Sequence, residues 1–469
     1  MKELPEEHLT LLKRIGEIAE SLGQEAYVVG GYVRDYFLNR LNHTEPDIDI
    51  VTLGSGLTLA RDVARHLPDS KLTVFKQFGT AHVRYGGMDL EFVGARKESY
   101  RSESRKPIVE DGTLEEDQLR RDLTINALSW SLNPTTFGVL LDPFHGVRDL
   151  QQRIIRTPID PETTFQDDPL RMMRAIRFAT QLGFEIEQST WNGIQSMAHR
   201  LSIISKERIT EELNKIILSP LPSVGFAHLL TSGLLEQFLP EMIRLQGVEE
   251  INGVRHKDNF WHTLEVLDNV ARVSDDLWLR WSAILHDIAK PPTKRFSNDV
   301  GWTFHGHDAI GAKWVPKIFR RLSLPLDERM KRVQKLVRLH LRPIALVSEE
   351  VTDSAIRRLI YEAGDEIEDL MVLCRADITS KNERKVRTYL RNFDRVEKRI
   401  HEVEKKDRIR NWKNPVSGED IMNELGVQEG PMIGRVKNAV KEAILDGKIP
   451  NERAAALDFM KEVGNKLLS

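Results

Sequence analysis

Apolar and polar residues follow two different periods along the chain. The first 150 or so residues open on a helical pattern and then show short runs at strand spacing, separated by turn residues. These runs are AYVV, DIDIV, AHVRY and LEFV. From about residue 160 onward, long amphipathic stretches at helical spacing dominate, with few strand signals. The pattern predicts an α+β protein in which a small mixed β-sheet head is followed by all-α regions.

Breaks in the helical pattern divide the second part of the chain further. Turn-rich segments lie near 157–161, 239–253 and 404–415. A chain of 469 residues is also long enough for roughly three globular units. The predicted domains are a head at 1–157, a helical neck at 158–245, a middle helical domain at 246–395 and a helical tail at 396–469.

Composition limits the kinds of partner that this chain binds. A net charge of −3 excludes a protein that grips nucleic acid along its whole length, so any RNA site must be a local patch. The segment 381–413 is such a patch, with 13 Lys or Arg against 6 Asp or Glu. Two interpretations stay open for it, an RNA-backbone site and a solvated helical face.

Other features indicate the compartment. The single Cys374 excludes intramolecular disulfides and thiolate metal clusters. The charged amino terminus lacks the apolar core of a signal peptide, and no apolar run approaches the ~18 residues of a membrane span. We therefore expect a soluble, cytoplasmic protein without a membrane partner. The oligomeric state stays open.

The clearest catalytic pattern is a pair of acids in the run DIDIV. Alternation places Asp47 and Asp49 on one face of a strand while Ile48 and Ile50 enter the core. Two like charges side by side are costly unless a cation lies between them. Hard oxygen ligands on a rigid strand suit Mg²⁺ that also binds substrate phosphates. The pattern predicts a Mg²⁺ site for phosphoryl transfer.

A glycine pair precedes these acids in the segment YVVGGYVRD. Gly30 and Gly31 lie where a strand runs into a helix, a place where phosphate can approach backbone N–H groups. The alternative is a purely structural turn. Arg34 has two possible partners, a triphosphate or the neighbouring Asp35, and spacing does not separate them.

Asp168 and Arg171 also admit two interpretations. A carboxylate and a guanidinium one helical turn apart present an acceptor edge and a donor edge, as a nucleobase does. Alternatively, Asp168 before Pro169 is a good N-cap that Arg171 balances electrostatically.

Five ordered segments carry a resemblance to a known family. They are GGYVRD, DIDIV, RRDLTINA at 120–127, DDPLR at 167–171 and RAIRF at 174–178. Together they resemble the class II tRNA nucleotidyltransferase and bacterial poly(A) polymerase family. The sequence departs from the usual pattern at Leu123, where phenylalanine is common, and at Val93 and Gly94, where threonines are common.

The resemblance implies a role for each matching residue. Asp47 and Asp49 would hold the catalytic metals, with Glu91 as a third carboxylate. The glycines and Arg34, together with Arg121, Asp122 and Asn126, would bind the ribose and triphosphate. Asp168 and Arg171 would read the base of incoming CTP or ATP, and Arg174 and Arg177 would steady them. The implied partner is tRNA.

A charged stretch without a clear period lies between Arg96 and Arg120. We interpret it as a mobile loop. In the family, members that add the terminal A use a flexible element at this place, so its presence favours complete CCA addition.

Histidines and aspartates recur through the middle domain on apolar, helix-patterned segments. A single histidine on such a face is more often structural. The ordered set resembles the HD superfamily of metal-dependent phosphohydrolases, which implies one divalent ion held by His262, His286, Asp287 and Asp377. His307 and His340 match the additional histidines of members that bind further metal or phosphate. Imidazole and carboxylate together suit Mn²⁺, Ni²⁺ or Fe, and a bound metal makes water a nucleophile near neutral pH.

These observations lead to ranked expectations for function. Addition of C, C and A to tRNA ranks first, with HD-domain phosphodiesterase or phosphatase activity on RNA ends beside it. An HD domain that only holds tRNA is the alternative for the second site. A poly(A) polymerase and a partial A-adding or CC-adding enzyme share most of the motifs, and a non-catalytic RNA-binding HD protein ranks last.

Overall fold

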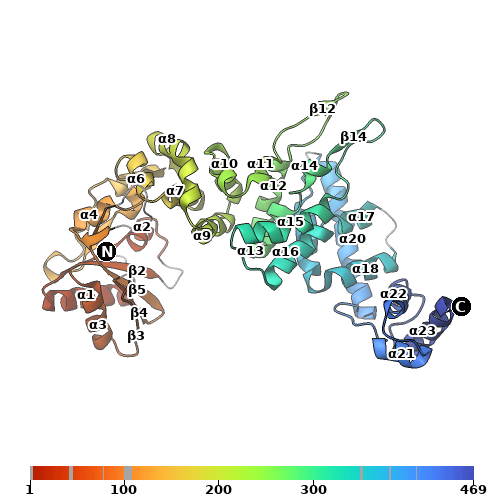
Figure 1. Cartoon of the computed structure of the whole chain (residues 1–469). Coiled ribbons are helices and arrows are strands. Elements are labelled where there is room, and N and C mark those ends of the chain that lie inside the picture. The colour runs from red at the N-terminus through yellow and green to blue at the C-terminus, as the bar shows by residue number, and fades with distance from the viewer. Residues whose placement is uncertain are drawn as a thin grey trace. The chain divides into compact units, whose positions relative to one another are not determined.

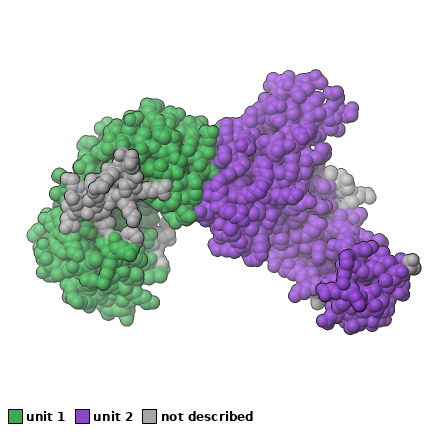
Figure 2. Space-filling view, viewed as in Figure 1, with its two compact units in different colours: residues 1–219, 224–238 green, residues 220–223, 239–469 purple. Residues whose placement is uncertain are grey.

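The structure is a computed structural model that describes residues 4–41, 46–77, 79–99, 108–348, 352–379, 382–407 and 409–468. It divides into two compact units, shown in Figure 2. Unit 1 comprises residues 1–219 and 224–238, and unit 2 comprises residues 220–223 and 239–469. Within the described ranges, no helix is long and apolar enough to cross a membrane.

The head of unit 1 is built on a mixed β-sheet. Among the described residues the sheet has seven strands, in the order β3-β4-β5-β2-β1-β8-β9. Figure 1 labels β2, β5, β4 and β3 in this sheet. The central strand β2 pairs in parallel with β5 and antiparallel with β1. The strands are β1 Glu25–Val29, β2 Asp47–Leu53, β3 Lys71–Phe75, β4 Thr80–Tyr85, β5 Met88–Gly94, β8 Ser129–Ser131 and β9 Leu140–Leu141. The predicted strands AYVV, DIDIV, AHVRY and LEFV are thus confirmed as parts of β1, β2, β4 and β5.

The head also contains helices, several of which pack on this sheet. The amphipathic opening of the chain forms α1 Glu6–Ser21, which buries Leu12 and Ile15. The other head helices are α2 Gly31–Phe37, α3 Gly56–His66, α4 Leu114–Leu119 and α5 Gly146–Gln152, with 3-10 turns at Thr124–Asn126 and Pro134–Thr136.

The charged stretch before Arg120 is more ordered than the predicted loop. Its flanks pair as a hairpin, β6 Arg96–Ser99 with β7 Ile108–Asp111, and α4 follows directly. Thr113 and Glu116 form a capping box that starts α4, because each side chain bonds the other's backbone N–H. The prediction of a loop over the whole stretch was therefore wrong for these parts, while residues 100–107 lie outside the described residues.

The neck continues unit 1 as a helical layer. Asp160 caps α6 with its side chain, and Pro161 occupies the first turn, where a missing N–H costs nothing. Helix α7 packs on α9. The elements are α6 Pro161–Asp167, α7 Leu170–Leu182, α8 Gln188–Met197, α9 Lys206–Ile217 and α10 Pro222–Thr231, 3-10 turns at Ala198–Ile203 and Leu235–Gln237, and a two-stranded parallel pair of β10 Ile154–Ile155 with β11 Glu185–Ile186.

Unit 2 is predominantly helical. Together with the mixed β-sheet of the head, its helices confirm the predicted α+β class. Two hairpins that the sequence pattern did not predict rise beside its helices in Figure 1, β12 Glu250–Ile251 with β13 Val254–Arg255 and β14 Arg295–Ser297 with β15 Gly301–Thr303. Strands of two or three residues are too short to show a period of two. The predicted domain boundary at residue 395 falls inside the continuous helix α20.

The helices of unit 2 follow one another through short connections. They are α11 Pro240–Ile243, α12 Asn259–Ala271, α13 Leu277–Leu285, α14 Lys290–Thr293, α15 His307–Arg321, α16 Glu328–Leu339, α17 Arg342–Ser348, α18 Asp353–Ala363, α19 Ile367–Ala376, α20 Glu383–Asp407, α21 Gly418–Leu425, α22 Pro431–Leu445 and α23 Arg453–Leu468, with a 3-10 turn at Gly364–Glu366.

Candidate active site and metal centre

Acidic side chains from two parallel strands meet on one face of the head sheet. The register of β2 and β5 sets Asp49 beside Glu91 and Asp47 beside Asp89. The alternate residues Ile48, Leu90 and others enter the core, so all four acids lie on the opposite face. The predicted acids Asp47, Asp49 and Glu91 are thus neighbours. The sequence analysis did not predict Asp89, although Asp89 lies two residues before Glu91 and therefore on the same face of β5.

Asp49 is the least solvated of these carboxylates. Burial raises the pKa of Asp49 to about 6; Arg121 opposes the shift, and the charges of Glu91 and Asp47 add to it. His82 on β4 lies 3.7 Å from Glu91, measured from Nε2 to Oε2. Clustered carboxylates that repel one another and remain reachable from water suit a hard divalent cation such as Mg²⁺. The donor set fits the predicted metal.

Gly30 brings the backbone close to this cluster. Its φ of +71° lies in the region that favours glycine. A Cβ at this position would lie 3.1 Å from Arg121 Nη1 and 3.7 Å from Asp49 Oδ2. Glycine therefore keeps open the space between a guanidinium and a carboxylate. Gly31 begins the short helix α2 that carries Arg34.

A chain of hydrogen bonds fixes the residues behind the glycines. Arg34 forms a two-point ion pair with Asp35, with both N···O distances at 2.9 Å, and donates from Nη1 to Asn126 Oδ1 at 2.8 Å. Asn126 in turn donates to Asp122 at 3.0 Å, and Asp122 accepts from Arg174 Nε at 2.6 Å. The ion pair with Asp35, one of the two partners considered for Arg34, is therefore present.

An arginine-rich cavity lies next to the carboxylate face. Its volume is about 300 Å³. The fully buried Asp117 anchors two of its arginines, Arg120 at 2.6 Å and Arg121 at 3.0 Å. Arg121 links this cavity to the acids, because it lines the cavity and also lies across Gly30 from Asp49. The cavity is lined by Arg120, Arg121, Asp122, Asp168, Leu170, Arg171, Arg174 and Arg208.

Asp168 and Arg171 line this cavity together, each with a partner. Asp168 Oδ1 accepts from the Leu170 N–H at 3.1 Å, although the N-cap residue of α7 is Pro169 and not Asp168 as the sequence suggested. Its Oδ2 accepts from Arg208 Nη2 at 2.7 Å. Arg171 is buried and donates from Nη1 to the Thr164 carbonyl at 3.2 Å. Arg208, on α9, was missed, since nothing in its local sequence marks it as a partner of Asp168.

Glu212 on α9 holds the two remaining arginines. It lies 3.6 Å from Arg174 Nη1 and 2.5 Å from Arg177 Nε. Arg177 also stacks on Phe178, with its guanidinium 3.9 Å from the ring centroid. Arg174 lines the cavity, whereas Arg177 lies behind it. Glu212 was also missed by the sequence analysis.

In unit 2, helix ends bring the predicted metal ligands together. Asp258 caps α12 and thereby sets His262 in its first turns, and His307 opens α15 after Gly306, whose φ is +78°. His286, His340 and Asp377 are the C-cap residues of α13, α16 and α19, and Asp287 follows His286.

Asp287 stands at the centre of this cluster. Its Oδ2 lies 3.5 Å from His262 Nε2 and 3.2 Å from His286 Nε2. Its Oδ1 lies 3.3 Å from His307 Nε2 and 3.8 Å from His340 Nε2, and Lys290 Nζ lies 2.5 Å from Oδ2. The two carboxylate oxygens therefore face two groups of histidines. Asp377 joins the first group, with Oδ1 2.9 Å from His262 Nε2.

The protonation pattern of the histidines suits metal binding. His286, His307 and His340 each place Nδ1 2.7 Å from a backbone carbonyl, which only accepts, so Nδ1 donates to the backbone and Nε2 faces the cluster. Burial lowers the pKa of His340 to about 4, and His286 adds to this effect, which keeps that imidazole neutral. Within the described part of the chain, His286 Nε2 is buried without a hydrogen-bond partner. All six predicted residues converge, and the donor set fits one or two divalent ions.

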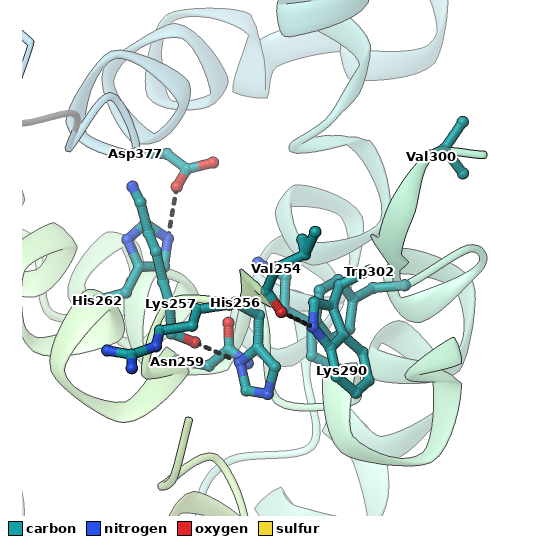
Figure 3. A pocket seen from close by; sticks show the side chains of 11 residues that line it. Val254, His256, Lys257, Asn259, His262, Lys290, Val300, Trp302 and Asp377 are labelled. Atoms are coloured by element: carbon teal, nitrogen blue, oxygen red, sulfur yellow. Dashed lines mark hydrogen bonds and ion pairs between the residues drawn. The ribbon is translucent and has the colours of Figure 1, made fainter. Parts of the chain in front are cut away.

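A basic pocket opens beside the cluster (Figure 3). Its volume is about 450 Å³, and His262 and Asp377 form part of its wall. The hairpins form another part, where Trp302 Nε1 donates to the Val254 carbonyl at 3.0 Å. Lys257 donates to Thr379, two residues beyond Asp377. The pocket thus offers cations beside a candidate metal centre. Its cationic and aromatic lining consists of Arg255, His256, Lys257, Lys290, Trp302 and Phe304.

The fold and the two sites define a nucleotidyltransferase head joined to an HD-type metal centre, and four domain families match the chain accordingly. They are the poly A polymerase head domain at residues 26–156, the RNA and SrmB-binding site of polymerase A at 183–245, the HD domain at 259–382 and the tRNA nucleotidyltransferase domain 2 at 329–460.

Individual relatives define the family more closely. The chain is 33% identical to the A-adding tRNA nucleotidyltransferase of Deinococcus radiodurans, over 73% of this chain and 78% of the relative. It is 32% identical to the CC-adding tRNA nucleotidyltransferase of Thermus thermophilus, over 92% of both chains. The CCA-adding enzyme of Streptococcus gordonii is 29% identical over 98% of this chain and 99% of its own. The chain belongs to the tRNA nucleotidyltransferase family, as the sequence motifs predicted.

Solved structures agree on the fold. The CTP complex of the CCA-adding enzyme of Bacillus stearothermophilus superposes with a TM-score of 0.63 at 23% identity, covering 98% of each chain. At this identity the likeness concerns the fold alone.

Proposed function

We propose that this protein adds C, C and A to the 3′ end of tRNA, using CTP and ATP and releasing pyrophosphate. The observation that carries the proposal is the position of Arg121, which lines an arginine-rich cavity and also lies across Gly30 from Asp49 in the carboxylate cluster. Carboxylates that hold Mg²⁺ and arginines that hold a triphosphate are the two requirements of nucleotidyl transfer. Both lie in the same unit.

Each residue has a defined task in this reaction. Asp47, Asp49 and Glu91 hold Mg²⁺, which when bound polarises the attacking 3′-hydroxyl and stabilises the pyrophosphate that leaves. Arg121 and Arg120, fixed by Asp117, bind phosphate oxygens.

The residues around Asp122 act on the nucleoside part. Asp122 is held by Asn126 and Arg174 and accepts a ribose hydroxyl, which favours NTP over dNTP. Arg34 holds Asn126 in place, and Arg177 acts on Arg174 through Glu212.

Asp168 and Arg171, which both line the cavity, recognise the base. Asp168 offers carboxylate oxygens and Arg171 offers N–H donors, so together they match the edge of cytosine or adenine in place of a template strand. Arg208 also lines this cavity and sets the orientation of Asp168 through their 2.7 Å contact. This assignment adds Arg208 to the pair proposed from the sequence.

The proposal is tested with a tRNA that lacks its last three nucleotides. With Mg²⁺ and CTP alone the product grows by two nucleotides, and the third is added only when ATP is also present. The measurement is product length at single-nucleotide resolution. Long A-tails with ATP would instead identify a poly(A) polymerase.

A partial activity is the second candidate for the head. The relatives from Deinococcus radiodurans and Thermus thermophilus are named for A addition and CC addition, and both exceed 30% identity. Growth that stops after two C residues in the presence of both nucleotides would identify a CC-adding enzyme. Growth only on a tRNA that already ends in CC would identify an A-adding enzyme.

We further propose that the HD centre hydrolyses phosphate esters at RNA ends, with Mn²⁺, Ni²⁺ or Fe as its metal. The two-sided approach of histidines to Asp287 supports this assignment, as does the buried Nε2 of His286, which makes no hydrogen bond among the described residues and lies 3.2 Å from Asp287 Oδ2. Metal bound there lowers the pKa of water, and Lys257 and Lys290 attract the phosphate of the substrate. Metal-dependent hydrolysis of bis(4-nitrophenyl) phosphate tests this proposal, and its absence with every metal would assign the domain to tRNA holding alone.

A further inference from the structure

Two aromatic rings lie beside the acids on the head sheet. The pairing register places Asp49, Glu91 and His82 in one row across β2, β5 and β4, on the face that carries the acids. His82 pairs with Thr73 of β3, and Phe75 lies two residues further along that strand, so its ring is on the same face. The ring centroids of Phe75 and His82 are 5.1 Å apart, with the rings inclined at 68°. We call Phe75 and His82 the aromatic pair.

The aromatic pair is accessible from water. Phe75 is 40% exposed, and the side chain of His82 is 47% exposed. Among the described residues, their neighbour β3 is the outermost strand at its end of the sheet. His82 Nε2 also lies 3.7 Å from Glu91 Oε2, so the pair reaches a candidate metal ligand. A partly exposed ring gains by stacking on another planar group, and the pair offers such a surface next to the acids.

The two sides of the acidic cluster differ in chemistry. Strands β1 and β5 flank β2 on opposite sides. Gly30 follows β1, and Arg121 lies across it from Asp49, so a cation occupies that side. On the other side, β5, β4 and β3 follow one another, as their labels show in Figure 1, and they carry Glu91 and the aromatic pair.

The reaction at phosphorus requires such a division. In an in-line displacement, the attacking oxygen and the leaving group lie on opposite sides of the phosphorus atom. The side with Arg121 suits the triphosphate, because a guanidinium binds phosphate oxygens. The attacking 3′-hydroxyl must then approach from the side of Glu91 and the aromatic pair.

We propose that the aromatic pair binds the 3′-terminal nucleotide of the acceptor RNA, with its base stacked on the Phe75 ring and its 3′-hydroxyl directed toward Glu91. Stacking on an aromatic ring accepts every base, because every base has a π-face. This tolerance suits an enzyme whose acceptor ends in a different nucleotide after each addition. The proposal rests on the nucleotide addition proposed above and assigns the binding position of its second substrate.

The test uses Phe75→Ala in the full-length protein, with Leu72→Ala as the matched control. Leu72 lies on the same strand and is 37% exposed, but alternation places it on the opposite face. Phe75 is chosen because removal of His82 would also disturb Glu91. A third variant, Phe75→Trp, keeps an aromatic ring. The acceptor is a tRNA that lacks its last three nucleotides, in one form with its natural terminal base and in another with a terminal nucleotide that carries no base.

The natural acceptor should reveal the lost stack. Phe75→Ala is expected to lower kcat/KM for this tRNA about tenfold, while KM for CTP stays unchanged. Leu72→Ala and Phe75→Trp should behave as wild type. An unchanged kcat/KM in Phe75→Ala, or an equal loss in Leu72→Ala, would overturn the proposal. A rise in KM for CTP alone would also overturn it, because Phe75 would then bind the incoming nucleotide.

The acceptor without a terminal base separates stacking from a structural role of the ring. On this acceptor, wild type and Phe75→Ala should have equal kcat/KM, because the RNA already lacks the partner of the ring. A further tenfold loss in Phe75→Ala on this acceptor would show that the ring supports the fold and would overturn the proposal.

A fluorescence measurement detects the stack without catalysis. A tRNA whose 3′-terminal nucleotide carries 2-aminopurine should lose fluorescence when it binds wild type or Leu72→Ala, since stacking quenches this base. The loss should be smaller with Phe75→Ala, and an equal loss would overturn the proposal whether or not nucleotides are added. Wild-type protein that quenches the probe through Phe75 but adds no nucleotide would refute the proposed addition and still support the stack.

Discussion

The head and the HD centre both gather acidic side chains, but they differ in exposure and in the groups around them. In the head, Glu91 keeps 44% of its side chain exposed, and the cluster is mainly carboxylates, with His82 at its edge 3.7 Å from Glu91. In the HD centre, Asp287 is 2% exposed and lies among four histidines. An open carboxylate face leaves room for water and substrate phosphates on the metal, whereas an enclosed mixed set holds its metal with protein groups. The difference predicts two independent reactions with different metals.

Asp49→Asn gives the largest expected effect and tests the independence of the sites from the head. The substitution keeps the shape of the side chain but removes a metal-binding charge, so nucleotide addition should fall on the order of 10³-fold or more. Hydrolysis of bis(4-nitrophenyl) phosphate should stay unchanged. The control is Asp69→Asn at an exposed position, where asparagine tolerates the left-handed backbone. Loss of both activities in the folded Asp49→Asn protein would refute the two-site comparison.

Asp287→Asn tests the same comparison from the other side. Asp287 contacts both groups of histidines, so its loss should reduce hydrolysis by about 10²- to 10³-fold and lower the metal content of the protein. Addition to tRNA should continue at the wild-type rate. Metal content measured by elemental analysis separates loss of the ion from loss of chemistry. Asp299→Asn at an exposed hairpin position serves as the control, and a full metal content in Asp287→Asn would contradict the assigned centre.

The two sites also differ in how far the sequence could predict them. Asp47 and Asp49 share one strand, so alternation alone placed both on the same face. Pairing with Glu91 depends on the parallel register of β5, which spacing does not supply and which the family resemblance suggested. Arg208 and Glu212 were not predicted as site residues. Their partners lie outside α9, and helical periodicity identifies only neighbours on one helix.

The HD ligands were predicted as an ordered set, although no local pattern brings them together. They extend from His262 to Asp377, and the helix ends that place them depend on packing of the whole unit. The resemblance to the HD superfamily, and not the hydrophobic periodicity, therefore predicted this set of ligands. The hairpins that complete the pocket escaped, because strands as short as Val254–Arg255 leave no period in the sequence.

Glu212→Ala addresses the buried ion pairs that support the head cavity. Removing this carboxylate leaves the buried Arg177 without its ion-pair partner, while Arg174 keeps Asp122, and an uncompensated buried charge typically costs about 3–5 kcal/mol of folding free energy. The melting temperature of unit 1 and the affinity for CTP and ATP should both fall, while HD hydrolysis persists. Glu211→Ala, at the exposed neighbouring position, is the matched control. Equal melting temperatures for the two variants would show that Glu212 does not carry this part of the structure.

The smallest expected effect concerns pH and distinguishes the head metal from the HD metal. Burial raises the pKa of Asp49 to about 6, above its value in the unfolded chain. Above pH 6 the carboxylate is charged while buried, which lowers the free energy of unfolding of the metal-free head. This loss of stability disappears as the pH falls from about 6 toward 4. Mg²⁺ needs the charged form. Its stabilising effect should therefore be larger at pH 8 than at pH 5, by about 1 kcal/mol or a few degrees in melting temperature.

Asp49→Asn isolates this effect from metal bound elsewhere in the chain. Asparagine does not titrate, so the part of the Mg²⁺-induced melting shift that depends on pH should vanish in the variant. Thermal melts of both proteins with and without Mg²⁺, at both pH values, measure the difference directly. A pH-dependent shift of the same size in Asp49→Asn would place the responsible group outside the head cluster, and the contrast between an open carboxylate site and an enclosed histidine site would then need another titrating residue to explain it.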